Sequence, residues 1–202
     1  MIGIIDYGAG NLFSVKNAMD FLGAESKIIC NPEELKQADK LILPGVGALP
    51  DAMKKLENTG LIEVILQETG KGKPLLGICL GMQMLFERGF EFGETTCLGL
   101  IPGTVSAMEG PEMALLKIPH MGWNDVKIAN ECALSKGIKE GQRFYYVHSY
   151  KAVTEPKYLS LYSEYGGIVP GLVFKDHIYG TQFHPEKSGA IGLQLLKNYI
   201  EL

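Results

Sequence analysis

The chain has 202 residues, of which 46% are hydrophobic and 21% charged, and its formal net charge is −4 at pH 7. This composition is typical of a globular protein and gives no reason to expect nucleic acid or an anionic membrane as a partner. No apolar run approaches the roughly 20 residues of a membrane span, and Met1 to Ile5 is typical of a first strand rather than of a signal peptide.

Strand-like and helix-like segments alternate over the first part of the chain. The expected elements, in chain order, are strand 2–7, helix 12–21, strand 25–30, a helix starting at Asn31-Pro32, strand 40–43, helix 49–66 with a break near Gly60, strand 75–78 and helix 80–88. Asn31 suits an N-cap, and Pro32 suits the first helical position. The alternation predicts βαβ units and a parallel sheet covered by helices on both faces.

After Gly99 the pattern changes to short strand-like segments joined by turns. These segments are 100–108, 123–128, 144–148, 158–163, 172–175 and 177–183, and a last helix is expected at 189–199. Part of this half is expected to be antiparallel. We therefore expect a single domain over residues 1–202 of the α/β class, three-layered (α/β/α), with a mostly parallel central sheet and an antiparallel strand portion. Its site should lie at the carboxyl ends of the parallel strands.

Cys79 follows an apolar strand within the sequence Gly77-Ile78-Cys79-Leu80-Gly81, and a helix-forming stretch leaves it. A free cysteine is most often an inert buried residue. Here the glycines predict a strained strand-to-helix elbow, which presents a nucleophile at the top of a sheet. A helix starting near Leu80 would direct its positive end at the sulfur and favour the thiolate.

The sequence His184-Pro185-Glu186 ends a strand pattern far downstream and provides the groups that a cysteine nucleophile requires. The simpler interpretations are a satisfied histidine at a strand end and a solvated carboxylate. In the functional interpretation, the His184 imidazole takes the thiol proton and returns a proton to a leaving amine. Glu186 would then fix the tautomer and orientation of that imidazole.

Two glycine-containing segments also follow strands. Pro44-Gly45-Val46-Gly47 is either a plain βα turn or an oxyanion hole, in which backbone N–H groups face a developing negative charge. Gly8-Ala9-Gly10-Asn11 resembles part of a dinucleotide loop, but Phe13 stands where that loop has its third glycine. We therefore interpret the second segment as a tight turn and not as a nucleotide site.

The remaining cysteines, histidines and aromatic residues give weaker signals. The four cysteines, Cys30, Cys79, Cys97 and Cys132, lack Cys-x-x-Cys spacing, which argues against zinc and for a reducing, cytoplasmic setting. No histidine pair has metal-ligand spacing, and no cofactor is indicated. The segments 120–124 and 145–150 are dense in aromatic residues and histidine, and they predict either core packing or a partner surface.

These motifs together resemble a known family. The segments 77–83, 44–47 and 184–186 look like those of the triad, or class I, glutamine amidotransferases, and the resemblance covers essentially the whole chain. Segments 6–12, 119–124, 146–150 and 184–188 are similar to one branch of that family, the glutaminase subunits of imidazole glycerol phosphate synthase in histidine biosynthesis. Other triad amidotransferases usually have Pro-Gly-Gly at the oxyanion strand, so Val46 departs from the wider family and fits this branch.

The resemblance implies a flavodoxin-like class I amidotransferase fold and hydrolysis of glutamine to glutamate and ammonia. In that reaction Cys79 forms a γ-glutamyl thioester, His184 acts as base and then as acid, and Glu186 orients it. The implied oxyanion hole is formed by Gly45, Val46, Gly47 and the amide of Leu80. The positions implied to contact glutamine are Gln83, His148, Ser149 and Tyr150.

The resemblance also implies a heterodimer with a separate (β/α)₈-barrel cyclase. Ammonia passes to that subunit, which makes imidazole glycerol phosphate and an aminoimidazole carboxamide ribonucleotide. The positions implied near the interface are Asn11, Met121, Trp123, Tyr145 and Lys187. Because a lone glutaminase would waste glutamine, we expect the free chain to hydrolyse glutamine only slowly. In that resting state the Gly45–Val46 peptide would present its carbonyl, not its N–H, to the site.

Three other interpretations stay open. The same chemistry could serve an anthranilate, aminodeoxychorismate or pyridoxal-phosphate synthase, although segments 119–124 and 146–150 favour the histidine branch. A cysteine elbow in an α/β domain also occurs in cysteine peptidases and in sensors that oxidise the cysteine, in which His184 and Glu186 would be idle. A catalytically dead binding module is hard to reconcile with an intact triad.

Overall fold

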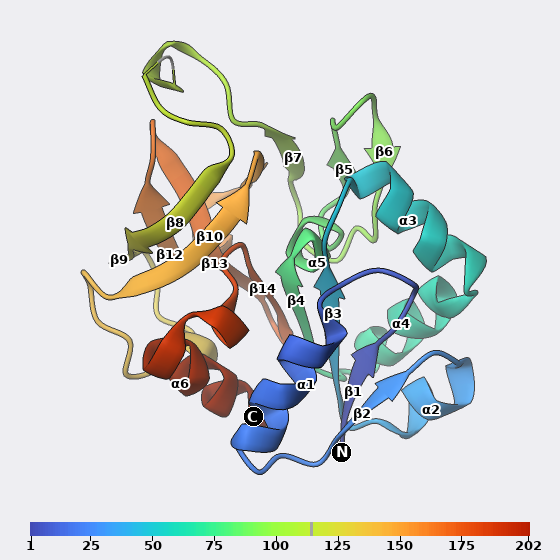
Figure 1. Cartoon of the computed structure of the whole chain (residues 1–202). Coiled ribbons are helices and arrows are strands. Elements are labelled where there is room, and N and C mark those ends of the chain that lie inside the picture. The colour runs from blue at the N-terminus through green and yellow to red at the C-terminus, as the bar shows by residue number, and fades with distance from the viewer. Residues whose placement is uncertain (114) are drawn as a thin grey trace.

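An eight-stranded sheet runs through the centre of the molecule in the order β2-β1-β3-β4-β14-β13-β12-β9 (Figure 1). This computed structural model describes residues 1–113 and 115–202. The parallel strands are β2 (Ser26–Ile29), β1 (Ile2–Ile5), β3 (Lys40–Gly45), β4 (Leu75–Cys79) and β14 (Ile178–Thr181). The antiparallel strands that extend them are β13 (Ile168–Lys175), β12 (Leu159–Glu164) and β9 (Lys127–Ile128).

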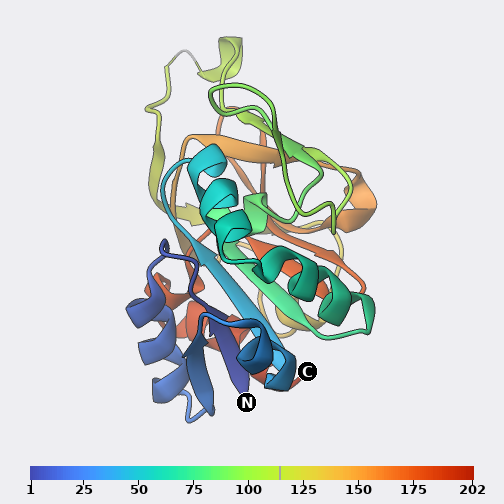
Figure 2. The ribbon, with the colours of Figure 1, turned by 90° about the vertical axis from the view of Figure 1, so that its right-hand side faces the viewer.

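Helices cover both faces of this sheet. One face packs against α1 (Leu12–Phe21) and α6 (Gly189–Ile200), and the other against α2 (Pro32–Gln37), α3 (Leu49–Asn58) and α4 (Leu61–Gly70). Figure 2 looks directly onto α3 and α4. Alternation along β1 divides the core, because successive strand residues point to opposite faces. Ile4 lies in the apolar core beneath α1 and α6, and Ile5 in the core beneath α2, α3 and α4. The expected three-layer α/β class with an antiparallel portion is confirmed.

Local sequence signals explain where several helices begin and end. The Asn31 side chain accepts a hydrogen bond from the Glu34 amide at 3.0 Å, as an N-cap does, and Pro32 is the first residue of α2. Gly60 takes a φ of +70° between α3 and α4, which ends one helix and starts the next.

The helix expected at 80–88 was wrong, because α5 spans only Leu80–Gln83. In a helix reaching residue 88, the Met84 carbonyl would accept a hydrogen bond from the Arg88 amide. It accepts instead from the Leu98 amide at 2.9 Å, so a neighbouring loop takes an acceptor that the longer helix would use. The chain then enters β5 (Arg88–Gly89), where Arg88 pairs with Thr96.

Figure 1 shows two small sheets beside the central one, with β8 (His120–Asp125) and β10 (Arg143–His148) on its left and with β5, β6 (Thr95–Thr96) and β7 (Thr104–Ala107) at the upper right. In the first, β10 pairs with β8. The other has the order β11 (Tyr150–Val153), β7, β5, β6. The expected strand 123–128 is thus divided between β8 and β9. The 3₁₀ helices are η1 (Pro111–Met113), η2 (Ala133–Ser135), η3 (Pro156–Tyr158) and η4 (Pro185–Lys187).

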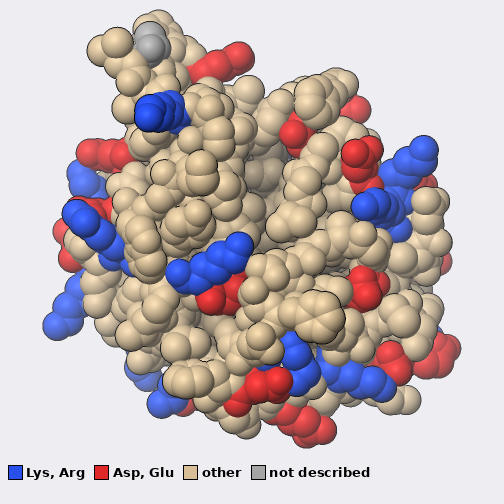
Figure 3. All heavy atoms as spheres, in the orientation of Figure 1, with Lys and Arg blue, Asp and Glu red and all other residues tan. Residues whose placement is uncertain are grey.

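The face that Figure 3 shows carries no large patch of one charge, because Lys and Arg side chains are interspersed there with Asp and Glu side chains. That face is hollowed in its upper part, where the visible atoms belong to uncharged residue types. Within the described residues, we find no helix with the length and apolarity that crossing a bilayer demands.

Candidate active site

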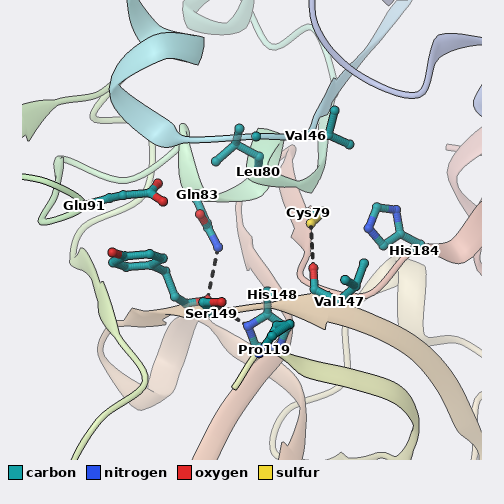
Figure 4. Close-up of a pocket in the computed structure, with 12 residues that line it drawn as sticks. Val46, Cys79, Leu80, Gln83, Glu91, Pro119, Val147, His148, Ser149 and His184 are labelled. Atoms are coloured by element: carbon teal, nitrogen blue, oxygen red, sulfur yellow. Dashed lines mark hydrogen bonds between the residues drawn. The ribbon is translucent and has the colours of Figure 1, made fainter. Parts of the chain in front are cut away.

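A pocket of about 290 Å³ opens at the carboxyl ends of β3 and β4 (Figure 4). This volume is at the small end for ligand pockets and suits a molecule of amino-acid size. Its walls come from the carboxyl ends of the central parallel strands and from segments of the two small sheets that lie beyond them. The lining residues are Val46, Gly47, Cys79, Leu80, Gln83, Glu91, Pro119, Val147, His148, Ser149, Tyr150 and His184.

Cys79 stands on the elbow that the sequence predicts. Its backbone has a φ of 56° and a ψ of −109°, a strained conformation for a residue with a Cβ, and it directly precedes α5. Such strain costs about 1–3 kcal/mol and persists only where the surroundings impose it. A Cβ on Gly81 would lie 1.8 Å from the Leu43 carbonyl oxygen, and a Cβ on Gly77 would lie 2.5 Å from the Gly81 oxygen. Only glycine lets these two backbone segments approach.

His184 and Glu186 form a buried pair beside this cysteine. The Nδ1 atom of His184 lies 2.8 Å from Oε1 of Glu186, and the two side chains are 3% and 1% exposed. Burial alone lowers the pKa of His184, but hydrogen bonds to Cys79 and Glu186, with the attraction of both anions, raise it to about 9. Because Nδ1 is engaged by Glu186, Nε2 is the nitrogen left for the thiol.

The predicted oxyanion residues lie in the same pocket as the Cys79 sulfur, and Figure 4 labels Val46 and Leu80 among them. Gly45 ends β3 and is paired with Cys79 of β4, so the strand runs two residues further than the sequence indicates. Val46 and Gly47 follow it along the pocket wall, and Gly47 has a φ of +99°. Leu80 is the first residue of α5, so its amide has no partner within the helix.

Glu91, which the sequence did not single out, lies in the pocket wall with Gln83. Gln83 is 4% exposed, and its Nε2 donates to the Tyr150 carbonyl at 3.2 Å and to Oε1 of Gln182 at 3.0 Å. Those bonds leave the Oε1 atom of Gln83 as the one that can accept a hydrogen bond from a ligand. Glu91 is 8% exposed, and its Oε2 accepts from the Leu49 amide at 2.6 Å. The pocket thus offers two hydrogen-bond acceptors, one of them anionic.

A buried chain of hydrogen bonds leads away from His148. Its Nδ1 bonds to the Tyr150 carbonyl at 2.8 Å and its Nε2 to Nδ1 of His120 at 2.9 Å. Nε2 of His120 faces Nδ2 of Asn124 at 3.2 Å. Because Asn124 Oδ1 accepts from the Asp125 amide, its Nδ2 must donate to Nε2 of His120. His120 then donates from Nδ1 to Nε2 of His148, and His148 donates from Nδ1 to the Tyr150 carbonyl. Burial lowers the pKa of His120 to about 4 and that of His148 to about 3, so both rings are neutral.

The five predicted interface residues lie on neighbouring elements beside the pocket. Met121 and Trp123 project outward from β8, 63% and 54% exposed, and the Trp123 ring meets that of Tyr145 across the β8–β10 pair. Lys187 is exposed on η4, which packs against both α1 and β10. Asn11 precedes α1, and its side chain makes no capping bond. The residues therefore form one face that adjoins the catalytic segment.

Known proteins are similar to this chain along its whole length. Residues 3–201 match the family model for glutamine amidotransferase class-I. The chain is 47% identical over 201 residues to imidazole glycerol phosphate synthase subunit HisH of Streptococcus sanguinis (strain SK36), covering 100% of this chain and 96% of that protein. It is 51% identical over 200 residues to the protein of the same name in Bacillus cereus (strain AH187), covering 98% and 93%. A crystal structure of a glutamine amidotransferase superposes with a TM-score of 0.77 at 20% identity, covering 99% of this chain and 97% of that one, and so shares the fold.

Proposed function

The chain belongs to the class-I glutamine amidotransferase family, and we propose that it is the glutaminase subunit of an imidazole glycerol phosphate synthase. The observation that carries this proposal is the strained Cys79 elbow next to a His184 that Glu186 holds. The relatives at 47% and 51% identity bear that subunit's name, which supports the choice of acceptor pathway. We take residues 1–202 to be one domain, since the family match spans residues 3–201.

The hydrogen-bond acceptors of the pocket wall favour one orientation of glutamine. Its α-ammonium group would lie between the Glu91 carboxylate and Oε1 of Gln83, the two acceptors of the wall, while Ser149 and Tyr150 line the same cavity. That placement directs the side-chain amide toward Cys79. The ring nitrogens of His148 both have protein partners, so its part in binding is through its ring edge and backbone.

The reaction follows from the groups around the sulfur. The Cys79 thiolate attacks the amide carbon, and N–H groups of the Val46–Gly47 segment and of Leu80 stabilise the oxyanion that forms. The charged His184 protonates the amide nitrogen as its bond to carbon breaks, so that ammonia departs and a γ-glutamyl thioester remains. His184, now neutral, removes a proton from water, and the resulting hydroxide releases glutamate and regenerates the thiolate.

The face formed by Asn11, Met121, Trp123, Tyr145 and Lys187 is the docking surface in this proposal. Exposed apolar side chains on it, beside an active site, are typical of a surface that binds a partner. The partner we propose is the (β/α)₈-barrel cyclase, which would receive the ammonia and form imidazole glycerol phosphate and an aminoimidazole carboxamide ribonucleotide. The four free cysteines suit the cytoplasm, where we place the complex.

The test is glutamate release by the purified chain alone and with the cyclase and its nucleotide substrate. We expect the loaded cyclase to raise the rate by about 10²-fold or more, the value of one oxyanion donor. Trp123→Ala should weaken this stimulation, whereas Phe21→Ala, an exposed aromatic residue at the far end of α1, should leave it unchanged. Hydrolysis indifferent to the cyclase would move the acceptor to another pathway. No hydrolysis at all would favour a redox or peptidase role for Cys79.

Glu91→Gln tests the substrate orientation. The neutral amide can still accept from the Leu49 amide but no longer attracts an ammonium group, so KM for glutamine should rise about 10- to 100-fold while kcat changes little. Glu94→Gln is the matched control, because Glu94 follows in the same loop but its side chain is 55% exposed. An unchanged KM in Glu91→Gln would show that the α-ammonium group binds elsewhere.

A further inference from the structure

We propose that Gln182 is a further catalytic residue, which donates a hydrogen bond to the Cys79 sulfur and favours its thiolate form. Its side chain is fully buried, and its Nε2 lies 3.8 Å from Sγ of Cys79. A buried carboxamide that presents its N–H to the nucleophile, rather than to a backbone carbonyl, needs a reason. The inference rests on the proposed function, in which Cys79 is the attacking group.

The orientation of the Gln182 carboxamide is fixed by its neighbours. The Tyr150 carbonyl can only accept, so it must face the Nε2 of Gln83. The same nitrogen then donates its second hydrogen to Oε1 of Gln182 at 3.0 Å. The Gln182 carbonyl is thereby turned away from the sulfur and its N–H groups toward it. The reverse orientation would set two NH₂ groups against each other and an oxygen against the thiolate.

The backbone explains why Gln182 and His184 reach the same atom. The Gln182 amide donates to the Gly171 carbonyl and the His184 amide to the Tyr145 carbonyl, both at 2.9 Å, so hydrogen bonds anchor the chain on either side of Phe183, where it bends after β14. One segment therefore presents a base and a neutral donor to the sulfur.

The two side chains act differently on the sulfur: His184 takes its proton, and Gln182 donates a hydrogen bond to the resulting anion. In the resting thiol, the S–H group can donate to the Val147 carbonyl at 3.8 Å, and Gln182 then contributes little. Once His184 holds the proton, the sulfur is an anion, and a hydrogen bond to an anion is about twice as strong as a neutral one. Because a carboxamide does not titrate, Gln182 favours the thiolate without competing for its proton.

The experiment is alkylation of Cys79 by iodoacetamide as a function of pH, followed on the Cys79 peptide by mass spectrometry. It uses the full chain without glutamine or cyclase, so it fails or succeeds independently of the proposed function. Gln182→Met keeps the side-chain length and removes the donor, and it should slow alkylation at low pH about tenfold, which raises the midpoint by about one pH unit. Gln67→Met, on the exposed face of α4, is the matched control, and exposed Cys30 is an internal reference.

Two further measurements separate this role from a structural one. Gln83→Met frees the Gln182 carboxamide to rotate and should give a smaller slowing, although Gln83 does not touch the sulfur. In glutamine hydrolysis, Gln182→Met should lower kcat with KM nearly unchanged. An alkylation profile identical to that of the unaltered chain would overturn the proposal. Should Gln182→Met not fold, Gln182→Glu replaces the donor by an acceptor and should slow alkylation more than tenfold; a normal profile there would overturn the proposal equally.

Discussion

Cys79→Ala should reduce glutamine hydrolysis by at least about 10⁴-fold, because the chain then lacks the atom that forms the thioester. Removal of the nucleophile from comparable triads costs about as much as removal of the whole triad. Glutamate release at saturating glutamine, in the presence of the loaded cyclase, measures the loss. Ammonium chloride added to the same complex should restore product formation, since only the supply of ammonia has been removed.

Cys30→Ala is the matched control for this substitution. Cys30 is exposed and lies just after β2, outside the pocket, so its loss should leave the rate unchanged. A Cys79→Ala chain that kept even a tenth of the rate would exclude the thioester mechanism. Failure of ammonium chloride to restore product formation would instead show that the variant no longer assembles with a working cyclase.

The elements that the sequence predicted well are those with local signals. The expected helix 12–21 coincides with α1, and Asn31 caps α2 because its short side chain reaches the Glu34 amide. The strands of the first half could be predicted from runs of apolar residues alone, since central parallel strands such as β1 and β4 are buried on both faces. The family resemblance, confirmed by the match over residues 3–201, depended on motifs of the same local kind.

The elements that were missed are set by distant contacts. A helix was expected to continue to residue 88, but the Leu98 amide takes the Met84 carbonyl that the Arg88 amide would need. The strands β5 and β6 have two residues each, which is too short for any period to be visible. β11 was not expected either, and it forms by pairing with β7, which lies more than forty residues earlier.

The candidate site was predictable where its residues stand within motifs. Cys79, His184 and the glycines of the elbow could be named because each motif is contiguous. Glu91 lies in a loop with no pattern, and only the fold brings it to the pocket. Gln182 carried a usable signal, since it lies two residues before His184 in a strand-like segment. Its orientation, however, depends on Gln83, 99 positions away in the sequence.

Gly81→Ala should lower the free energy of unfolding by at least about 3 kcal/mol and abolish activity in whatever folds. The added Cβ would lie 1.8 Å from the carbonyl oxygen of Leu43 and 2.8 Å from its carbon. Those atoms belong to β3, which is hydrogen-bonded between β1 and β4, so they cannot rotate away as a side chain can. Urea unfolding followed by circular dichroism measures the change.

Gly70→Ala is the control that isolates the steric cause. Gly70 ends α4, and a Cβ there would have no neighbour within 4 Å, so the substitution should be neutral or stabilise by up to about 1 kcal/mol. Both changes add one methyl group to a glycine next to a helix end, and only the approach of β3 distinguishes them. Equal stability of the two variants would mean that β3 and α5 separate easily. The backbone strain at Cys79 would then lack the rigid surroundings that it requires, and the elbow could not hold the sulfur in place for attack.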